Sequence, residues 1–563
     1  MSVLRSERRA GAYYDSIVLM QLQSALRDLD GIGDAGAVMA TAANLEILAG
    51  NELLPDGAAE DVSDLLIVVR AESEDLGDAA LGQVDELLAK RDSGTGGTGT
   101  ASYRPRSLEA AVKAAPEGHW VQVSVPGRYA ADVAGEALDL GRNVFLYSDN
   151  VTVDDEAALK ERAARKGLLV MGPDCGTAMI GGVGLGFANR VRRGAVGLVA
   201  ASGTGLQEVA SLVDQNGGGI SHAVGTGGRD LGAAAGARTA LQGLDLLARD
   251  PDTRVIVLIS KPPEPEIARR LLAAARATGK PVVVAFLGYA PPARHRGNLH
   301  YALGLVDAAE LAMALQDATA QELTDGATDT AGNERRYLRG LFAGGTLAYE
   351  ALLNLRLSLQ PIASNLSADG VERLADLSRS VGHTILDLGE DELTVGRLHP
   401  MMDQELRLRR LKQEAADPEV AMILLDLVLG DGAHADPASE IVAAVSDVPG
   451  DGPEILAVVV GTENDPQGLE EQKEKLRDAG ITVFGDLSQA LERIEHKLAI
   501  STTTAESEVP LAALESPRQV VNVGVEVFHD SLAAQEVDGI QVDWRPPAGG
   551  NEKLQAILKK MKG

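Results

Sequence analysis

The chain has 563 residues, 45% of them hydrophobic and only 3% aromatic, with a formal net charge of −30 at pH 7. This length exceeds one hydrophobic core and predicts about three or four domains, and the negative charge argues against nucleic-acid binding. No apolar run is long enough for a membrane span, the N-terminus lacks a signal-peptide pattern, and the single cysteine, Cys175, fits a reducing cytoplasm.

The first 92 residues mix helix and strand signals and predict a small α+β domain, 1–92. Residues 16–29 have helical spacing, and residues 36–40 and 65–70 have the composition of strands. A Gly/Thr-rich run at 92–100 predicts a flexible linker after this domain.

Strands and helices then alternate regularly, which is typical of doubly wound parallel sheets. We expect a truncated Rossmann-like domain at 103–190 and a flavodoxin-like domain at 191–318. Buried strands are predicted at 121–125, 143–147, 168–171, 195–201, 255–260 and 281–287.

A polar linker at 319–334 separates this part from a second flavodoxin-like domain, expected at 335–498. A helix is predicted at 347–355, and a C-terminal extension at 518–563 contributes a strand at 520–527. The strands of the second domain are predicted at 339–342, 384–388, 421–427, 455–460 and 482–484. The predicted fold class is therefore multidomain α/β.

The strongest site candidate follows the apolar run at 195–201. Ser202, Gly203, Thr204 and Gly205 separate this buried strand from a helix with one apolar face. Such a helix start aims free N–H groups and the positive end of its dipole at the edge of the sheet, which predicts a phosphate or carboxylate site. The alternative is an ordinary strand-to-helix turn capped by Ser202 or Thr204.

A second turn of this kind contains Gly344, Gly345 and Thr346, and we expect the two turns to face one another across a domain interface.

Arg397 is a candidate for a bidentate clamp on a substrate carboxylate, and a surface ion pair is the alternative role for it. Cys175 is expected to pack rather than react, because no cation is evident near it in the sequence. Further candidates at strand ends are Asp174, Gly227 with Gly228 and Arg229, and Arg397 with His399.

Several local patterns resemble NDP-forming acyl-CoA ligases such as succinyl-CoA synthetase. The α-subunit is matched by residues 148–155, 169–175, 201–204 and 224–230, and the C-terminal domain of the β-subunit by 343–350 and 384–436. Asn150 becomes a candidate through the first of these segments. The chain more closely resembles the FdrA family, nearly end to end, through residues 172–177, 185–189, 200–205, 219–223, 260–263, 396–401 and 544–551.

The chain departs from the ligases in three places. No Gly-rich loop for CoA opens a helix in residues 1–130, and no ATP-grasp-sized segment or Walker pattern is present. The ligases carry a phosphate-shuttling histidine in a loop of small residues, whereas His300 here has Leu299 and Tyr301 beside it. We therefore expect no ATP use and no resident cofactor, with phosphate as co-substrate and CoA as the weaker candidate. No metal site is expected, since Asp426, His434 and Asp436 lack a firm ligand spacing.

The FdrA resemblance implies a cytoplasmic subunit of an oxamate carbamoyltransferase-type enzyme in allantoin catabolism, working with co-encoded subunits. Its reaction would convert an N-carbamoyl compound such as oxalurate and phosphate to carbamoyl phosphate and oxamate. Residues 202–205 with Asp174 and residues 344–346 would bind phosphate and the carbonyl oxygen, and Arg397 or Arg229 would clamp the carboxylate. The alternatives are an acyl-CoA ligase-like protein that binds CoA or an acyl phosphate, and a non-catalytic scaffold subunit.

Overall fold

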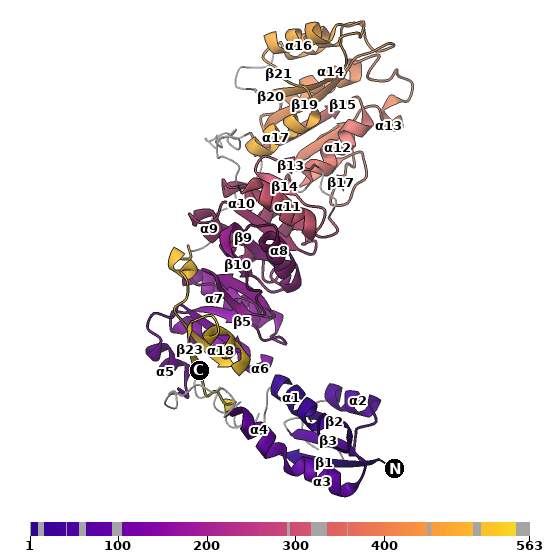
Figure 1. Cartoon of the computed structure of the whole chain (residues 1–563). Helices are drawn as coiled ribbons and strands as arrows, with labels where there is room; N and C mark the ends of the chain where they lie inside the picture. The colour runs from indigo at the N-terminus through magenta and orange to yellow at the C-terminus, as the bar shows by residue number, and fades with distance from the viewer. Residues whose placement is uncertain are drawn as a thin grey trace. The chain divides into compact units, whose positions relative to one another are not determined.

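The structure is a computed structural model that describes residues 2–9, 16–40, 42–55, 64–92, 104–289, 293–316, 335–356, 358–446, 452–498 and 508–547. The chain forms two compact units, residues 1–155 with 517–563, and residues 156–516 (Figure 1). The linkers expected at 92–100 and 319–334 lie outside the described residues, apart from Asp92. The α/β fold class is confirmed, and each unit is described by itself below.

The N-terminal domain is a small antiparallel sheet in the order β1-β3-β2. Leu19, Leu22 and Leu26 of α1 pack on one face, and Leu48 of α2 packs on the other. The sequence did not predict β1, because charged side chains alternate along this edge strand. The elements are β1 (Val3–Arg9), α1 (Ser16–Arg27), β2 (Ile32–Met39), α2 (Ala42–Gly50), β3 (Leu65–Ala71), α3 (Glu74–Gly82) and α4 (Val84–Asp92).

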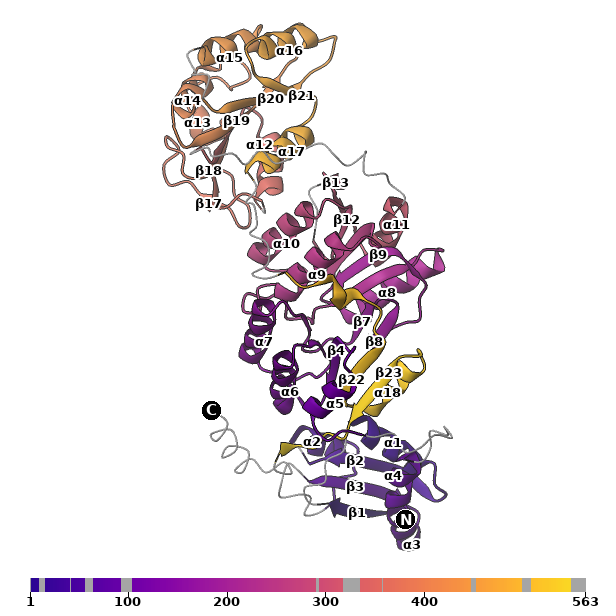
Figure 2. The ribbon, with the colours of Figure 1, turned by 90° about the vertical axis from the view of Figure 1, so that its left-hand side faces the viewer.

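The rest of the first unit is a parallel sheet shared between the two ends of its sequence. Strand β22 pairs in parallel with β4 and with β23 (Figure 2), and β4 pairs with β5, so the strands of this unit run in the order β23-β22-β4-β5. The C-terminal segment expected as a separate extension is thus part of this sheet, and residues 526–533 form a helix. The elements are α5 (Leu108–Ala114), β4 (Trp120–Ser124), α6 (Gly127–Asp139), β5 (Asn143–Leu146), β22 (Gln519–Gly524), α18 (Glu526–Ala533) and β23 (Asp538–Val542).

The first sheet of the second unit has the order β13-β14-β12-β11-β9-β10-β7-β8. Helices α8 and α11 pack on one face of its parallel centre, and α9 and α10 on the other. The elements are α7 (Val153–Arg165), β6 (Val170–Met171), β7 (Thr177–Ile180), β8 (Val183–Gly186), β9 (Arg193–Ala200), α8 (Gly203–Gln215), β10 (Ile220–Gly225), α9 (Arg238–Arg249), β11 (Val255–Ser260), α10 (Pro265–Ala277), β12 (Val282–Phe286), β13 (His295–Arg296), β14 (Leu299–Tyr301) and α11 (Leu305–Leu315).

The second sheet of this unit is parallel, in the order β17-β16-β18-β15-β19-β20-β21. Helices α12 and α17 cover one face, and α14, α15 and α16 the other. The elements are β15 (Tyr337–Phe342), α12 (Gly345–Leu355), β16 (Ile362–Ser364), β17 (Glu372–Arg373), β18 (His383–Asp387), α13 (Asp391–Thr394), α14 (Glu405–Ala415), β19 (Val420–Val428), α15 (Pro437–Val445), β20 (Glu454–Val460), α16 (Leu469–Asp478), β21 (Thr482–Phe484), α17 (Leu487–Leu498) and the 3₁₀ turn η2 (Leu511–Leu514).

Candidate functional site

The turn between β9 and α8 leaves backbone donors open to solvent. The Gly205 N–H donates to the Oγ of Ser202, the N-cap of α8, at 3.2 Å. A Cβ on Gly205 would lie 3.1 Å from Ile259 Cγ2, so this glycine is needed for packing, whereas Gly203 is exposed and its Cβ would meet nothing closer than 4.0 Å. Neither Gly203 nor Thr204 has a hydrogen-bond partner for its N–H among the described residues. An anion can therefore approach two free donors at a helix start.

This turn lies at the point where the strand order of the sheet reverses. Strands β9 and β11 are neighbours, but β9 leads into α8 on one face and β11 into α10 on the other. Doubly wound folds bind ligands in the crevice at such a point. Lys261 follows β11 directly, is exposed, and has no ion-pair partner in the described parts of the chain. In the sequence Lys261 stands out only within the FdrA-like segment 260–263, although its position at the end of a predicted strand was a usable signal.

Two other segments, the turn after β10 and the loop after β6, lie at the same edge of the sheet. The Thr226 N–H donates to Ala200 O at 2.9 Å, and a Cβ on Gly228 would lie 3.8 Å from Ala201 O. A Cβ on Gly227 would lie only 2.3 Å from Pro173 O, so this turn packs against the loop that carries Asp174. Asp174 is exposed and has a left-handed backbone, φ 55°.

A buried ion network missed by the sequence reasoning lies behind the Gly227–Gly228 turn. The Lys160 Nζ lies 2.9 Å from Glu156 Oε1 and 2.8 Å from Asp230 Oδ1, and it donates to Thr226 O at 3.0 Å. Arg229 pairs with Glu156 Oε2 at 3.0 Å, and 44% of its side chain remains exposed. Arg229 is thus tied to a protein carboxylate, and Lys160 holds the turn in place. The signal available in the sequence was a charged i, i+4 pair on an otherwise buried helix face.

Cys175 is a packing residue. It is buried, its Sγ lies 3.6 Å from Thr177 O, and a Cβ on Gly225 would lie 2.5 Å from that sulfur. Burial raises the pKa of the Cys175 thiol to about 12. The thiolate needed for nucleophilic attack does not form at neutral pH.

The turn before α12 differs from the first one because protein carboxylates occupy it. The N–H groups of Ala343 and Gly344 donate to the two oxygens of Asp426 at 2.7 and 2.9 Å. Arg407 pairs with the same carboxylate at 3.2 Å. Gly345 has no room for a side chain, because its Cβ would lie 2.5 Å from Asp387 Oδ2. Gly345 and Thr346 keep free N–H groups within the described structure, but two carboxylates lie next to them.

The remaining candidates are exposed. Arg397 and His399 lie on the loop after α13, and the Arg397 side chain has no partner among the described residues. Asn150 belongs to the other unit, where it follows β5 with a left-handed backbone, φ 53°. Within the second unit the candidates form two groups, one around the α8 turn and one around the α12 turn. No hydrogen bond or ion pair between described residues joins these two groups.

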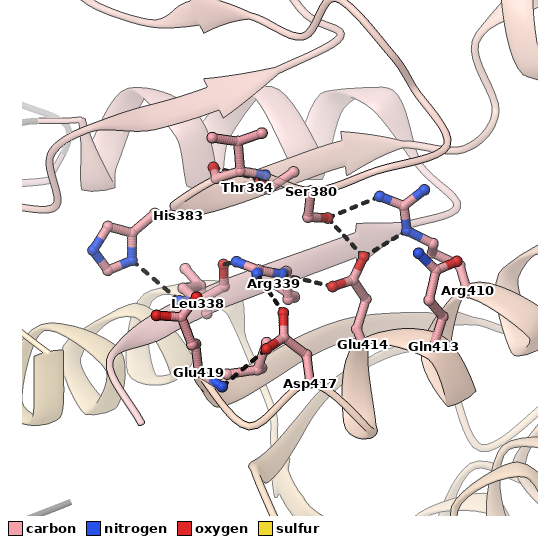
Figure 3. Close-up of polar contacts among 12 residues, drawn as sticks. Leu338, Arg339, Ser380, His383, Thr384, Arg410, Gln413, Glu414, Asp417 and Glu419 are labelled. Carbon is pink, nitrogen blue, oxygen red and sulfur yellow. Dashed lines mark hydrogen bonds and ion pairs between the residues drawn. The ribbon is translucent and has the colours of Figure 1, made fainter. Parts of the chain in front are cut away.

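A second polar network lies at the opposite edge of the α12 sheet (Figure 3). Arg339 lies 2.7 Å from Glu414 and 3.2 Å from Asp417, and Arg410 lies 2.6 Å from Glu414. His383 Nδ1 accepts the Leu338 N–H at 3.1 Å. The network is at the amino ends of the parallel strands, away from the ligand-binding edge, and its charges are paired, which indicates a structural role.

No group of three or more His, Cys, Asp or Glu side chains in the described part of the chain is arranged to hold a metal ion. Asp436 instead caps α15 through Ser439 and pairs with Lys475, and His434 lies 3.4 Å from Glu440. None of the described helices is long and apolar enough to cross a membrane.

Comparison with protein families matches three separate stretches of the chain. Residues 1–105 match the AllF heavy metal-associated domain, residues 193–326 the succinyl-CoA ligase like flavodoxin domain, and residues 341–496 the CoA-ligase family. The fold and these matches define a succinyl-CoA ligase-like protein with an AllF-type N-terminal domain.

The uncharacterized protein YahF of Escherichia coli K12 is 40% identical over 489 residues, which cover 84% of this chain and 94% of YahF. The chain therefore belongs to the YahF family. The alpha 2 subunit of an ADP-forming succinate–CoA ligase from Archaeoglobus fulgidus is 31% identical over 38% of this chain and 74% of that subunit. A solved acetyl-coenzyme A synthetase from Ca. Korarchaeum cryptofilum is 15% identical over 67% of this chain and 81% of its own, with a TM-score of 0.26, too low to support an argument.

The N-terminal domain does not fit the heavy metal that its family description implies. Soft metal ions bind cysteine thiolate and histidine imidazole, and residues 1–105 contain neither residue type.

The parallel sheet of the first unit does not fit the pyrophosphate of CoA. The strand order reverses between β22 and β4, because β22 is followed by β23 on one side and β4 by β5 on the other. The crevice that would bind a ligand therefore lies between these two strands. Glu526 occupies the first turn of α18 and pairs with Arg104, so a carboxylate stands at the helix start that would receive the pyrophosphate. Gly127 begins α6, the helix that follows β4. A Cβ on Gly127 would lie 2.1 Å from Asp149 O, so the backbone of another loop lies directly against this helix start.

Proposed function

We propose that the chain is a subunit of an oxamate carbamoyltransferase-type enzyme that binds phosphate at the α8 turn. The FdrA-like motifs and the AllF-type N-terminal domain support a link to allantoin catabolism. Oxalurate and inorganic phosphate would be the substrates, and carbamoyl phosphate and oxamate the products. The partners would be co-encoded subunits, and no nucleotide takes part.

One observation carries the choice of the α8 turn as the phosphate site. Two helix starts were expected to bind anions. Among the described residues, the N–H donors of the α8 start and Lys261 at the neighbouring strand end have no partner, whereas the α12 start is bordered by Asp387 and Asp426. A phosphate dianion is stabilised by the first environment and repelled by the second.

The chemistry requires charge stabilisation and positioning. A phosphate oxygen attacks the carbamoyl carbon and forms a C–O bond, the C–N bond to the oxamate nitrogen breaks, and the proton lost by phosphate ends on that nitrogen. The N–H groups of Gly203 and Thr204, with Lys261, would hold the phosphate. The carbonyl oxygen gains charge in this step, which donors of the α8 turn would stabilise, and Arg397 would bind the substrate carboxylate.

The test is Gly203→Leu in the complex of the chain with its co-encoded subunits, assayed for phosphate-dependent oxalurate cleavage. The leucine side chain would block the approach of an oxyanion to the helix start, and loss of such donors lowers rates by about 100-fold or more. Gly304→Leu is the matched control, because Gly304 caps α11 and has nothing within 4 Å of its Cβ position. Normal turnover by a folded Gly203→Leu variant would refute the proposal.

The second candidate function is an acyl-CoA ligase-like protein, favoured by the match of residues 193–326 and 341–496 to ligase families. It requires CoA or an acyl phosphate to bind. Tight CoA binding by the full chain would favour this candidate over carbamoyl transfer.

A further inference from the structure

The turn after β10 borders the end of β9 on the side opposite α8. Strand β10 leads into α9, whose apolar residues pack with those of α10 on the face of the sheet away from α8. The Thr226 N–H donates to Ala200 O at 2.9 Å, and a Cβ on Gly228 would lie 3.8 Å from Ala201 O. The crevice at the end of β9 therefore lies between the α8 start and this turn.

Gly228 presents a backbone donor at this crevice. It is exposed, and its N–H has no hydrogen-bond partner among the described residues. Because Gly228 has no side chain, an oxygen of a bound anion can come within hydrogen-bond distance of this N–H. The turn thus offers the crevice a donor from the side opposite Gly203.

A buried ion network keeps the turn in place. The Lys160 Nζ donates to Thr226 O at 3.0 Å and to the Asp230 carboxylate at 2.8 Å. The same carboxylate accepts the N–H groups of Thr239 and Ala240 at the start of α9, at 3.2 and 2.9 Å. The backbone of the turn is therefore fixed before a ligand arrives, which lowers the ordering cost of binding.

A buried hydroxyl on the same side of the sheet lacks a partner. Ser260 is 1% exposed, and its Oγ has no hydrogen-bond partner among the described residues. Ile259, one residue earlier, pairs with Ala200 and points toward α8, since its Cγ2 lies 3.1 Å from a Cβ on Gly205. Because side chains alternate along a strand, Ser260 points to the other face, on which the Gly228 turn lies. An unpartnered buried hydroxyl costs free energy that a ligand oxygen at this edge would recover.

We propose that the phosphate site at the α8 start is two-sided, with the Gly228 N–H and the Ser260 hydroxyl donating from the opposite side of the crevice. This inference rests on the proposed function and adds residues that decide which anion the site prefers. The α8 start alone suits any small anion, including a carboxylate. Donors on two sides suit a tetrahedral phosphate, because its oxygens point to all sides, whereas both oxygens of a carboxylate lie on one side.

NMR of the full chain labelled with ¹⁵N-glycine tests the Gly228 donor, with inorganic phosphate as the probe. The amide signals of Gly203 and Gly228 are assigned by their loss in Gly203→Ala and Gly228→Ala, since both positions have room for a methyl group. We expect both signals to move along one saturation curve. Gly304, the N-cap of α11, is the control and should not move, because it follows β14 and lies outside the β9 crevice.

The outcomes of this titration separate the two-sided site from the proposed function. Movement of Gly203 with an unmoved Gly228 refutes the two-sided site and leaves the phosphate site at the α8 start standing. If neither signal moves, the phosphate site and the inference that rests on it both fail.

Ser260→Ala and the control Ser221→Ala separate a binding role from a structural one. Ser221 is also buried, but its Oγ lies 2.7 Å from Thr253 Oγ1 at the amino ends of the strands. Ser260→Ala should weaken phosphate binding about tenfold or more, because a hydrogen bond to a charged group is lost, without lowering the Tm of the ligand-free chain. Ser221→Ala should lower the Tm and keep the Kd for phosphate within about twofold.

Calorimetric titration of the same proteins with phosphate and with acetate completes the test. The wild type should bind phosphate more tightly than acetate, and Ser260→Ala should reduce this preference. A Kd for phosphate unchanged by Ser260→Ala, or acetate bound by the wild type as tightly as phosphate, would overturn the proposal.

Discussion

Cys175 shows how burial decides the chemistry of a single side chain. Its sulfur is enclosed by Gly225 and Thr177, and the pKa of the thiol is raised to about 12. We predict that Cys175→Ala keeps turnover within about twofold and that iodoacetamide does not alkylate the native chain at pH 8, because only the thiolate reacts. Mass spectrometry after brief labelling checks this. Rapid native labelling, with loss of activity, would contradict the packing role.

His383 makes stability depend on pH. Burial, together with the nearby positive charge of Arg339 (Figure 3), lowers its pKa from 6.5 to about 4. Because the unfolded chain binds this proton more readily, the stabilisation is complete above about pH 6.5 and is lost as pH falls towards 4. A shift of this size corresponds to about 3 kcal/mol.

His383→Asn offers the matched comparison, because its amide oxygen can accept the Leu338 N–H without titrating. Urea unfolding at pH 7 and pH 4.5 should show a smaller acid-induced loss of stability in the variant than in the wild type. Equal losses in the two proteins would mean that His383 is not buried in its neutral form.

At the site, sequence reasoning identified residues whose signal is local and missed those whose contacts are tertiary. Ser202–Gly205 was visible as a strand-to-helix turn, and Ser202 caps α8, which was one of the two caps named in the alternative interpretation. Asp426 reaches the α12 turn from the neighbouring strand β19. The sequence of the turn therefore gives no sign that the N–H groups of Ala343 and Gly344 already have a hydrogen-bond acceptor. Lys160 likewise meets Asp230 across 70 residues of chain.

At the scale of elements, the hairpin β13–β14 restricts the position of His300. His300 is paired with Val283 of β12 and with His295, and its Nε2 is buried without a partner among the described residues. The pKa of His300 is lowered by burial and by His295, which keeps the ring neutral. Arg296, also in the hairpin, lies 3.3 Å from the buried Glu495 of α17. The hairpin is thus held by β12 through strand β14 and by Glu495 through Arg296.

We therefore predict that His300→Asn lowers the rate by less than about tenfold, equivalent to about 1.4 kcal/mol of barrier. A shuttle must move between two sites, and a ring held in a strand does not. Rapid-quench analysis for acid-labile phosphate on the chain provides the check. Phosphohistidine at His300 during turnover, or a His300→Asn variant slower by several orders of magnitude, would show that phosphate is transferred through this histidine as in the ligases.

Two strands that sequence patterns predicted well are buried: the expected 255–260 coincides with β11, and 421–427 lies within β19. The expected 482–484 coincides with β21, although this strand is partly exposed at the end of its sheet. The hairpins β7–β8 and β13–β14 went unpredicted because they are short and have no apolar run of their own. Their formation depends on neighbours that the local sequence does not contain.

At the scale of the whole molecule, the first unit combines distant parts of the chain. β22 lies beside β4, about 400 residues earlier, with Val521 opposite Val121. Sequence periodicity identified a strand near 520–527 but had no means to assign its sheet, since strand pairing is set by tertiary contacts. The result is a Rossmann-like sheet completed by the C-terminal segment, in which Glu526 stands where a nucleotide-type ligand would place its phosphates.

The central claim is that the α8 turn binds phosphate or carbamoyl phosphate, and not CoA. Calorimetric titration of the full chain with carbamoyl phosphate and with CoA, for the wild type and for Gly203→Leu, tests it most directly. The account predicts saturable binding of carbamoyl phosphate that Gly203→Leu abolishes, and no binding heat with CoA. Saturable CoA binding, or carbamoyl phosphate binding that survives Gly203→Leu, would contradict it.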